Sequence, residues 1–296
     1  MMNINFKDII GPQDEYLIIE DGVVSAYSSG ISNFLIEKDL NLKIIYYFTR
    51  DTEIEFQISE GVKVNITELI FDVASEADIN LKYSVEAGAE VNFLSVKNST
   101  QKGKTRINTN ISLAKDAYIK LNELASFPGV SVLNNRISLD EPGSQAVLKT
   151  VALNTSGEKQ ILSANIFHNS EATTSELQSY GIVANSSTLI ISTDGIIKKG
   201  SSKVELRQNT KGLVLDENSH ISASPILEIE DFDVIASHGA SIGAIDEEML
   251  YYLMSRGISR SDAEKLVISG FINPFFASIS EEKLQDWIRS LININL

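Results

Sequence analysis

His238 is the residue in this chain whose type and setting best suit metal chemistry. It lies between Ser237 and Gly239, and a glycine lets the backbone approach another group closely. A neutral imidazole is a good ligand for iron or zinc. A lone histidine is more often a structural or surface residue, so that interpretation stays open. A ligand role would also require further ligands from elsewhere.

The other two histidines are weaker candidates. His168 precedes a polar turn and a Thr-Thr-Ser run, where a corner or packing role is the simpler interpretation. His220 follows the polar turn Glu217-Asn218-Ser219 and is expected to be exposed.

A run of carboxylates offers a different chemistry. Oxygen ligands of this kind can bind a hard cation, and paired carboxylates can act on sugars, as in β-helix polysaccharide enzymes. The simpler interpretation is that they are the solvent-facing residues of a strand that alternates apolar and acidic side chains. The residues are Glu228, Glu230, Asp231 and Asp233.

Composition excludes several kinds of site. The chain has no cysteine, so it cannot by itself hold a zinc–thiolate site or a thiolate-ligated iron–sulfur cluster. With 25 basic against 40 acidic residues, its net charge of −15 disfavours nucleic acid and anionic membranes as partners. No signal peptide and no apolar run of about 18 residues is evident, so a cytoplasmic location is expected.

The elements that would position these side chains show a repeat of 27 or 28 residues. Each copy begins with a turn residue and continues with alternating polar and apolar residues, which is typical of strands. A fixed period in this range favours a solenoid of stacked turns, each with several short strands. Evenly spaced hairpins of an antiparallel sandwich would give the same pattern, so that alternative stays open. The copies begin at Gly61, Gly88, Asp116 and Gly143.

Beyond Ala244 the hydrophobic period lengthens to that of helices. We expect Asp246 to cap a first helix that Gly257 closes, and Ser259 to cap a second that ends near Gly270. The strand-rich body is expected to end at a turn formed by His238 and Gly239, with the helical hairpin 246–270 projecting from it.

One more helix is expected near the end of the chain. Pro274 would separate it from the preceding pair, and Ser278 with Glu281 forms a capping-box pattern at its start. Leu284, Trp287, Ile288 and Leu291 would then lie on one apolar face.

Three blocks within residues 224–276 resemble, in the right order, the C-terminal core of the SufB/SufD family. These are scaffold proteins of the Suf iron–sulfur cluster assembly system. Weaker likeness extends back to about residue 150. The blocks are Pro225–Ile229, Ser237–Ser241 and Leu250–Ile258.

The resemblance favours a SufD-like chain. SufB-type members are expected to have a reactive cysteine and a Glu-His-Glu form of the histidine motif, whereas Ser237 and Gly239 flank His238 here. Many members have a cysteine where this chain has Ala236, so any role of that cysteine is lost. His168 also matches a family position inside the solenoid.

The resemblance implies a fold and a function as well. The fold is a right-handed parallel β-helix (solenoid) with a small C-terminal helical domain. The histidine that matches His238 is implicated in cluster assembly at the interface with SufB, where the partner must supply thiolates. The C-terminal helices dock the SufC ATPase, and interface-type residues there are Tyr251, Tyr252, Met254 and Arg256.

We therefore expect a leader over 1–15, a β-helix core over 16–240 and a helical domain over 241–296. The chain would be a non-catalytic scaffold with no tightly bound cofactor, meeting iron or a nascent iron–sulfur cluster only within a complex. Its expected partners are a SufC-type ATPase and either a SufB-type paralogue or a second copy. A β-helix carbohydrate-binding or carbohydrate-active protein is the alternative.

Overall fold

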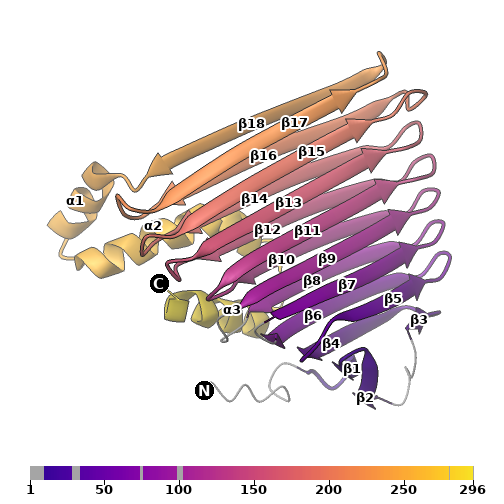
Figure 1. Ribbon diagram of the computed structural model, residues 1–296, viewed down its shortest axis with the longest axis horizontal. Helices are drawn as coiled ribbons and strands as arrows, with labels where there is room; N and C mark the ends of the chain where they lie inside the picture. Colours follow the sequence, from indigo (N-terminus) through magenta and orange to yellow (C-terminus); the bar gives the residue numbers. More distant parts are fainter. Residues whose placement is uncertain (1–9, 29–33, 74–75, 99–102, 280, 296) are drawn as a thin grey trace.

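The computed structural model describes residues 10–28, 34–73, 76–98, 103–279 and 281–295, without the side chains of residues 71, 72, 291 and 293–295. Within these residues the chain forms a parallel β-solenoid of about eight turns, followed by three helices (Figure 1). Each turn adds one strand to each of two facing sheets. Of the predicted leader, residues 1–9 lie outside the described residues.

The two sheets collect alternate strands of the chain. The ten-stranded sheet contains β1 (Glu15–Glu20), β2 (Val23–Tyr27), β4 (Leu40–Phe48), β6 (Lys63–Val73), β8 (Glu90–Asn98), β10 (Tyr118–Ser126), β12 (Gln145–Asn154), β14 (Thr174–Val183), β16 (Val204–Val214) and β18 (Val234–Ala244). The eight-stranded sheet contains β3 (Leu35–Ile36), β5 (Thr52–Ile58), β7 (Glu76–Val85), β9 (Lys104–Leu113), β11 (Val130–Leu139), β13 (Lys159–His168), β15 (Thr188–Ile197) and β17 (His220–Ile229).

Strand pairing decides between the two folds that the repeat allows. All pairs between successive turns are parallel, and only the terminal pair β1–β2 is antiparallel. The solenoid prediction is therefore confirmed, and the antiparallel sandwich is wrong. One detail differs, because a turn holds two strands of about ten residues rather than several short ones.

The repeat marks one corner of each turn. Its turn residues all have positive φ, with Gly61 at 71°, Gly88 at 65°, Asp116 at 55° and Gly143 at 76°. Successive corners are hydrogen-bonded, for example from Gly61 N to Ala87 O (2.9 Å) and from Gly88 N to Lys115 O (2.8 Å). A left-handed residue is needed once per turn, which explains the glycines at that spacing.

The core lies between the sheets. Inward positions alternate along each strand, and most hold Ile, Leu, Val or an aromatic residue that is fully buried. Equivalent positions on successive turns stack in parallel register, which forms files of side chains along the solenoid axis. Each file is therefore a row of neighbouring side chains, one from each turn, that can contact one another along the axis.

The helices cover the outer face of the ten-stranded sheet. They are α1 (Glu247–Ser255), α2 (Arg260–Phe276) and α3 (Glu282–Asn295). A second apolar cluster joins Leu250, Phe275 and Ile288 of these helices to outward residues of the sheet such as Val96 and Val151. This cover explains why the later residues of several strands in this sheet are buried on both faces.

Helix capping at α1 and α2 follows the sequence. The Asp246 carboxylate accepts from the backbone N–H groups of Glu248 and Met249, and the Ser259 hydroxyl accepts from that of Asp262. Gly257, just beyond α1, has a φ of 89°, which completes the predicted C-terminal signal.

Three local predictions were wrong. No turn occurs at His238, because β18 continues through it to Ala244 and through the predicted domain boundary at residue 240. Helix α2 does not end near Gly270 but runs to Phe276 with Pro274 inside it. Burial of Phe275 and Phe276 against the sheet stabilises this last turn despite the missing proline N–H.

The predicted capping box was also wrong. Helix α3 begins at Glu282, and the Ser278 hydroxyl instead donates to Asn122 Oδ1 (2.8 Å) and contacts Phe275 O (2.5 Å). Of the predicted apolar face, Leu284 and Ile288 are buried, and the Leu291 side chain lies outside the described residues. No helix in the described ranges combines the length and apolar character needed to cross a membrane.

Candidate functional site

The last turn of the solenoid is open. Strand β18 ends the ten-stranded sheet and β17 ends the eight-stranded sheet, so each has one edge with no neighbouring strand among the described residues (Figure 1). Large apolar side chains are exposed there, including Ile226, Ile229, Ile235 and Ile242. An unpaired edge with exposed apolar residues is a surface suited to receiving another strand.

His238 lies in the middle of β18, on the face that continues the core. It pairs in register with Gln208 of β16, whose side chain points inward and is buried. The Gln208 amide can bridge to the opposite sheet, with the Thr193 carbonyl at 3.2 Å and the Gly195 N–H at 2.9 Å. His238 itself is exposed, because no further turn covers it. The imidazole is thus an inward-facing side chain at an uncovered end.

This geometry limits what His238 can do alone. Within the described residues, no three His, Cys, Asp or Glu side chains gather in a way that could hold a metal ion. One imidazole supplies one ligand, whereas iron and zinc sites take three or four from protein or substrate. The remaining ligands would have to come from a second molecule placed against the open edge.

The corner between β17 and β18 holds Glu230, Asp231 and Asp233 of the acidic run, whereas Glu228 lies within β17. Asp231 Oδ1 accepts from Phe232 N (2.8 Å) and Asp233 N (3.2 Å), and Asp231 Oδ2 accepts from Gly200 N (3.1 Å). These backbone hydrogen bonds, that of Asp233 first, lower the pKa of the Asp231 carboxyl. Glu230 likewise accepts from Lys199 N at 3.2 Å. Both carboxylates therefore hold this corner to the preceding turn through backbone hydrogen bonds.

His168 is a packing residue. It is fully buried at the end of β13, and its ring nitrogens contact the hydroxyls of Thr173 (2.7 Å) and Ser175 (2.8 Å). Burial lowers the pKa of the imidazole to about 4, so the ring is neutral near pH 7. His220, by contrast, is exposed at the start of β17.

Helix α1 displays the residues predicted to bind a partner. Only Leu250 of this helix is buried, whereas Tyr251 is 75% and Tyr252 57% exposed. Met254 is 41% exposed, and the Arg256 guanidinium lies 5.2 Å from the centre of the Tyr252 ring. These side chains therefore do not pack on the last turn, which was the alternative explanation for their presence.

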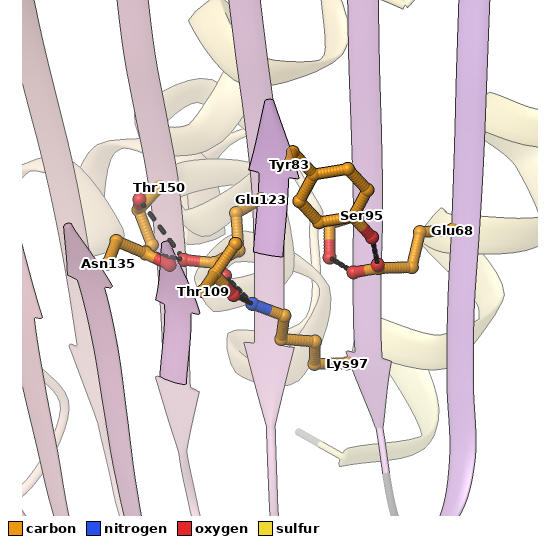
Figure 2. Close-up of polar contacts among 8 residues, drawn as sticks. All are labelled: Glu68, Tyr83, Ser95, Lys97, Thr109, Glu123, Asn135 and Thr150. Carbon is orange, nitrogen blue, oxygen red and sulfur yellow. Dashed lines mark hydrogen bonds and ion pairs between the residues drawn. The ribbon is translucent and has the colours of Figure 1, made fainter. Parts of the chain in front are cut away.

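A buried polar network inside the solenoid was not foreseen from the sequence (Figure 2). Lys97 Nζ forms an ion pair with Glu123 Oε1 and donates to Thr109 Oγ1 at 3.1 Å. Glu123 Oε2 accepts from Asn135 Nδ2 at 2.6 Å and contacts Thr150 Oγ1 at 3.5 Å. Both charged side chains are at most 1% exposed.

A second part of the network is centred on Glu68 of β6, one turn before Lys97 of β8. The Glu68 carboxylate accepts from Tyr83 Oη (2.5 Å) and Ser95 Oγ (2.6 Å), and Tyr83 Oη lies 3.3 Å from Tyr46 Oη. Burial raises the pKa of Glu68, and Lys97 opposes the shift only in part. Burial also raises the pKa of Tyr83 well above its usual value, and the Glu68 charge adds to this.

Register places much of this network in one file. Glu68, Ser95, Glu123, Thr150 and Ser179 pair successively on the ten-stranded sheet. The sequence does indicate that Glu68 is buried, because it lies at the same inward-facing phase of the strand as Ile66 and Ile70. A charged residue on the apolar phase of a strand is the pattern that would have revealed it.

Comparison with known proteins identifies the family. The model of the SufBD core domain of the SUF system for FeS cluster assembly matches residues 53–271, which covers the solenoid from β5 onward, α1 and most of α2. The match includes His238, the last turn and the acidic corner.

Individual relatives agree with this match. The iron-sulfur cluster assembly protein SufD of Bacillus subtilis is 30% identical over 77% of this chain and 51% of its own length. SufBD family proteins of Staphylococcus epidermidis and Staphylococcus haemolyticus are each 30% identical over 47% of this chain and 30% of their own. The chain thus spans about half the length or less of these relatives. By sequence and by fold, the chain belongs to the SufB/SufD family of iron–sulfur cluster assembly proteins and is SufD-like.

Proposed function

We propose that this chain is a non-catalytic scaffold subunit in iron–sulfur cluster assembly, pairing through its last turn with a SufB-type chain and docking a SufC-type ATPase on α1. The observation that supports this most directly is the position of His238. It faces inward on a strand whose outer edge is free, so a strand added by a partner would enclose it.

The chemistry follows from what the chain has and lacks. An imidazole donates one nitrogen to iron, and a cysteine-free chain brings no thiolate. A SufB-type partner would supply sulfur ligands opposite His238, so that iron and sulfide, which are the substrates, meet ligands from two subunits. A pair of two identical copies would bring two imidazoles and no thiolate, which favours the unlike partner.

The ATPase would act through the helices. Exposed Tyr251, Tyr252 and Met254 on α1 form an apolar and aromatic surface of the kind that anchors protein interfaces. Helix α2 continues from α1 onto the ten-stranded sheet, where Lys149 Nζ donates to Pro274 O at 3.0 Å. Nucleotide binding would change the position of the last turn only if the ATPase has different affinities for two arrangements of these helices.

The test uses the complete complex reconstituted with SufB-type and SufC-type subunits. We expect His238→Ala to reduce cluster formation, followed by visible absorbance, by about tenfold or more, which is the effect of losing an interaction of at least about 1.4 kcal/mol. His220→Ala removes another exposed histidine from the same turn and should leave the yield unchanged. Because His238 is exposed, its replacement should change the free energy of unfolding by less than about 0.5 kcal/mol. An unchanged yield with His238→Ala would remove it as a site.

The docking surface needs a separate measurement. Tyr251→Ala with Tyr252→Ala should weaken ATPase binding in a pull-down while leaving the pairing with the SufB-type chain intact. Loss of both interactions together would show instead that the helices support the open edge.

A further inference from the structure

The outer face of the eight-stranded sheet carries a groove unrelated to the open end. It has a volume of about 280 Å³ and runs from Glu55 of β5 across β7, β9 and β11. Parallel register builds its floor from two files. One file is Lys82, Asn110 and Arg136, and the other is Ser84, Ser112 and Ser138.

Arg136 has no acidic partner within the part of the chain that the structure describes. Its guanidinium lies over the Phe167 ring, 3.7 Å from the ring centre, which holds the charged plane in one orientation. Its in-register neighbours, Asn110 and Asn165, are both neutral amides. The chain has 40 acidic and only 25 basic residues, yet the strand neighbours of Arg136 are two amides and not carboxylates.

The nearest carboxylates of this file lie at a distance. Asp194 is two strands from Arg136, which at about 4.8 Å per strand is about 10 Å. Glu55, which lines the other end of the groove, is three strands away, or about 14 Å. Lys82, at the Glu55 side, is already neutralised by Glu53 at 2.5 Å. The positive end of the groove therefore lies at Arg136, and the Glu55 carboxylate lines its opposite end.

The serine file supplies hydroxyl groups beside this charge. The side chains of Ser84, Ser112 and Ser138 make no hydrogen bond to any other described residue, and all three are only partly exposed. Arginine with neighbouring hydroxyl and amide donors is the donor set that recognises oxyanions, with the guanidinium offering two parallel N–H groups.

We propose that this groove binds an oxyanion of the phosphate type, carried by a small soluble molecule. The Arg136 guanidinium would donate two hydrogen bonds to the anion, and Ser112, Ser138 and Asn110 would each donate one. Phe167 is a positioning residue, because it orients the guanidinium without touching the ligand. The same face shows the contrasting case: Arg106 donates from Nη1 to Asp78 Oδ2 at 3.1 Å and is therefore satisfied.

The experiment is a titration of the full chain with inorganic phosphate, against chloride at matched ionic strength, followed by amide NMR shifts. We expect saturable shifts confined to residues 110–112 and 136–138, with a Kd of about 1 mM, as suits a few charge-assisted hydrogen bonds. Arg136→Gln should weaken binding about tenfold or more, whereas Arg106→Gln on the same face should leave it unchanged. Phe167→Leu should weaken phosphate binding while the chain stays folded.

Two results would overturn the proposal. One is phosphate binding that survives Arg136→Gln, and the other is a set of shifts that chloride reproduces. The source of the anion is tested with glycerol 3-phosphate and with vesicles containing phosphatidic acid. Binding of the soluble ester supports the proposal, and binding to the vesicles alone would contradict it.

Discussion

Replacing Glu68 with glutamine is expected to stabilise the folded chain by an amount that grows with pH. The Glu68 carboxyl is fully buried between Tyr83 and Ser95, and burial raises its pKa. Glutamine has the shape of the protonated acid, and its amide can accept one hydrogen bond and donate the other. The substitution therefore keeps the contacts and removes the need to hold a carboxyl group in the core.

The pKa shift of Glu68 determines how the free energy of unfolding depends on pH. The folded pKa of Glu68 lies above its ordinary value of 4.5. The group therefore contributes stability that is fully present below that value and is lost as pH rises through the folded pKa. Each pH unit in this window changes the free energy of unfolding by about 1.4 kcal/mol. The Glu68→Gln chain lacks this term, so its advantage over the natural chain should increase at that slope.

Urea unfolding at a series of pH values measures the effect directly. Above about pH 4.5 the gap between the two chains should widen with pH by about 1.4 kcal/mol per unit, levelling off where the carboxyl ionises in the folded state. Glu123→Gln is the matched control in the same file. It leaves Lys97 buried without its partner and should cost about 3–5 kcal/mol. A Glu68→Gln chain that is less stable than the natural one near neutral pH, or a gap independent of pH, would refute the reasoning.

Three further predictions concern packing and titration. Because burial lowers the pKa of His168 to about 4 from 6.5, the natural chain should lose about 1.4 kcal/mol per pH unit below about pH 6.5. His168→Gln should remove that slope in urea unfolding, and His220→Gln should retain it. Phe275→Ala should cost about 3–5 kcal/mol by chemical denaturation, whereas Phe232→Ala, at a fully exposed position, should change stability by less than about 0.5 kcal/mol. Gly129→Ala places a Cβ 2.4 Å from the backbone oxygen of Gly103 and should lower the thermal midpoint by more than Gly243→Ala on β18, whose Cβ would meet no atom within 4 Å. Equal shifts for the two glycine variants would contradict that packing.

The solenoid could be predicted because its signals are local and repeated. Once per turn the chain needs a left-handed corner, and Gly61, Gly88, Asp116 and Gly143 record that need at a constant spacing. The caps of α1 and α2 were equally readable, because Asp246 and Ser259 act on N–H groups two or three residues away. Such interactions depend only on residues that are close in the sequence, so the sequence alone can predict them.

The errors arose where distant contacts outweigh local preference. Pro274 was interpreted as a helix break, yet Phe275 and Phe276 in the last turn of α2 are buried against a sheet that includes strands more than a hundred residues earlier in the chain. Likewise, Lys97 and Glu123 read as polar strand residues, because each meets its partner only after the turns have stacked. His238 was singled out by its motif, but its placement on an edge strand rather than in a turn required the register of β16 and β18.

The unequal ends of the solenoid bear on how many molecules can join. One end carries the long strands β17 and β18, whereas the other ends in β2 and in β3, which has two residues. Among the described residues only one end offers full-length strands, so once two such ends had joined, neither molecule would have a second one to offer. Raising the concentration would then fill a population of pairs without lengthening a fibre, which lets a protein made largely of stacked strands keep a free sheet edge safely.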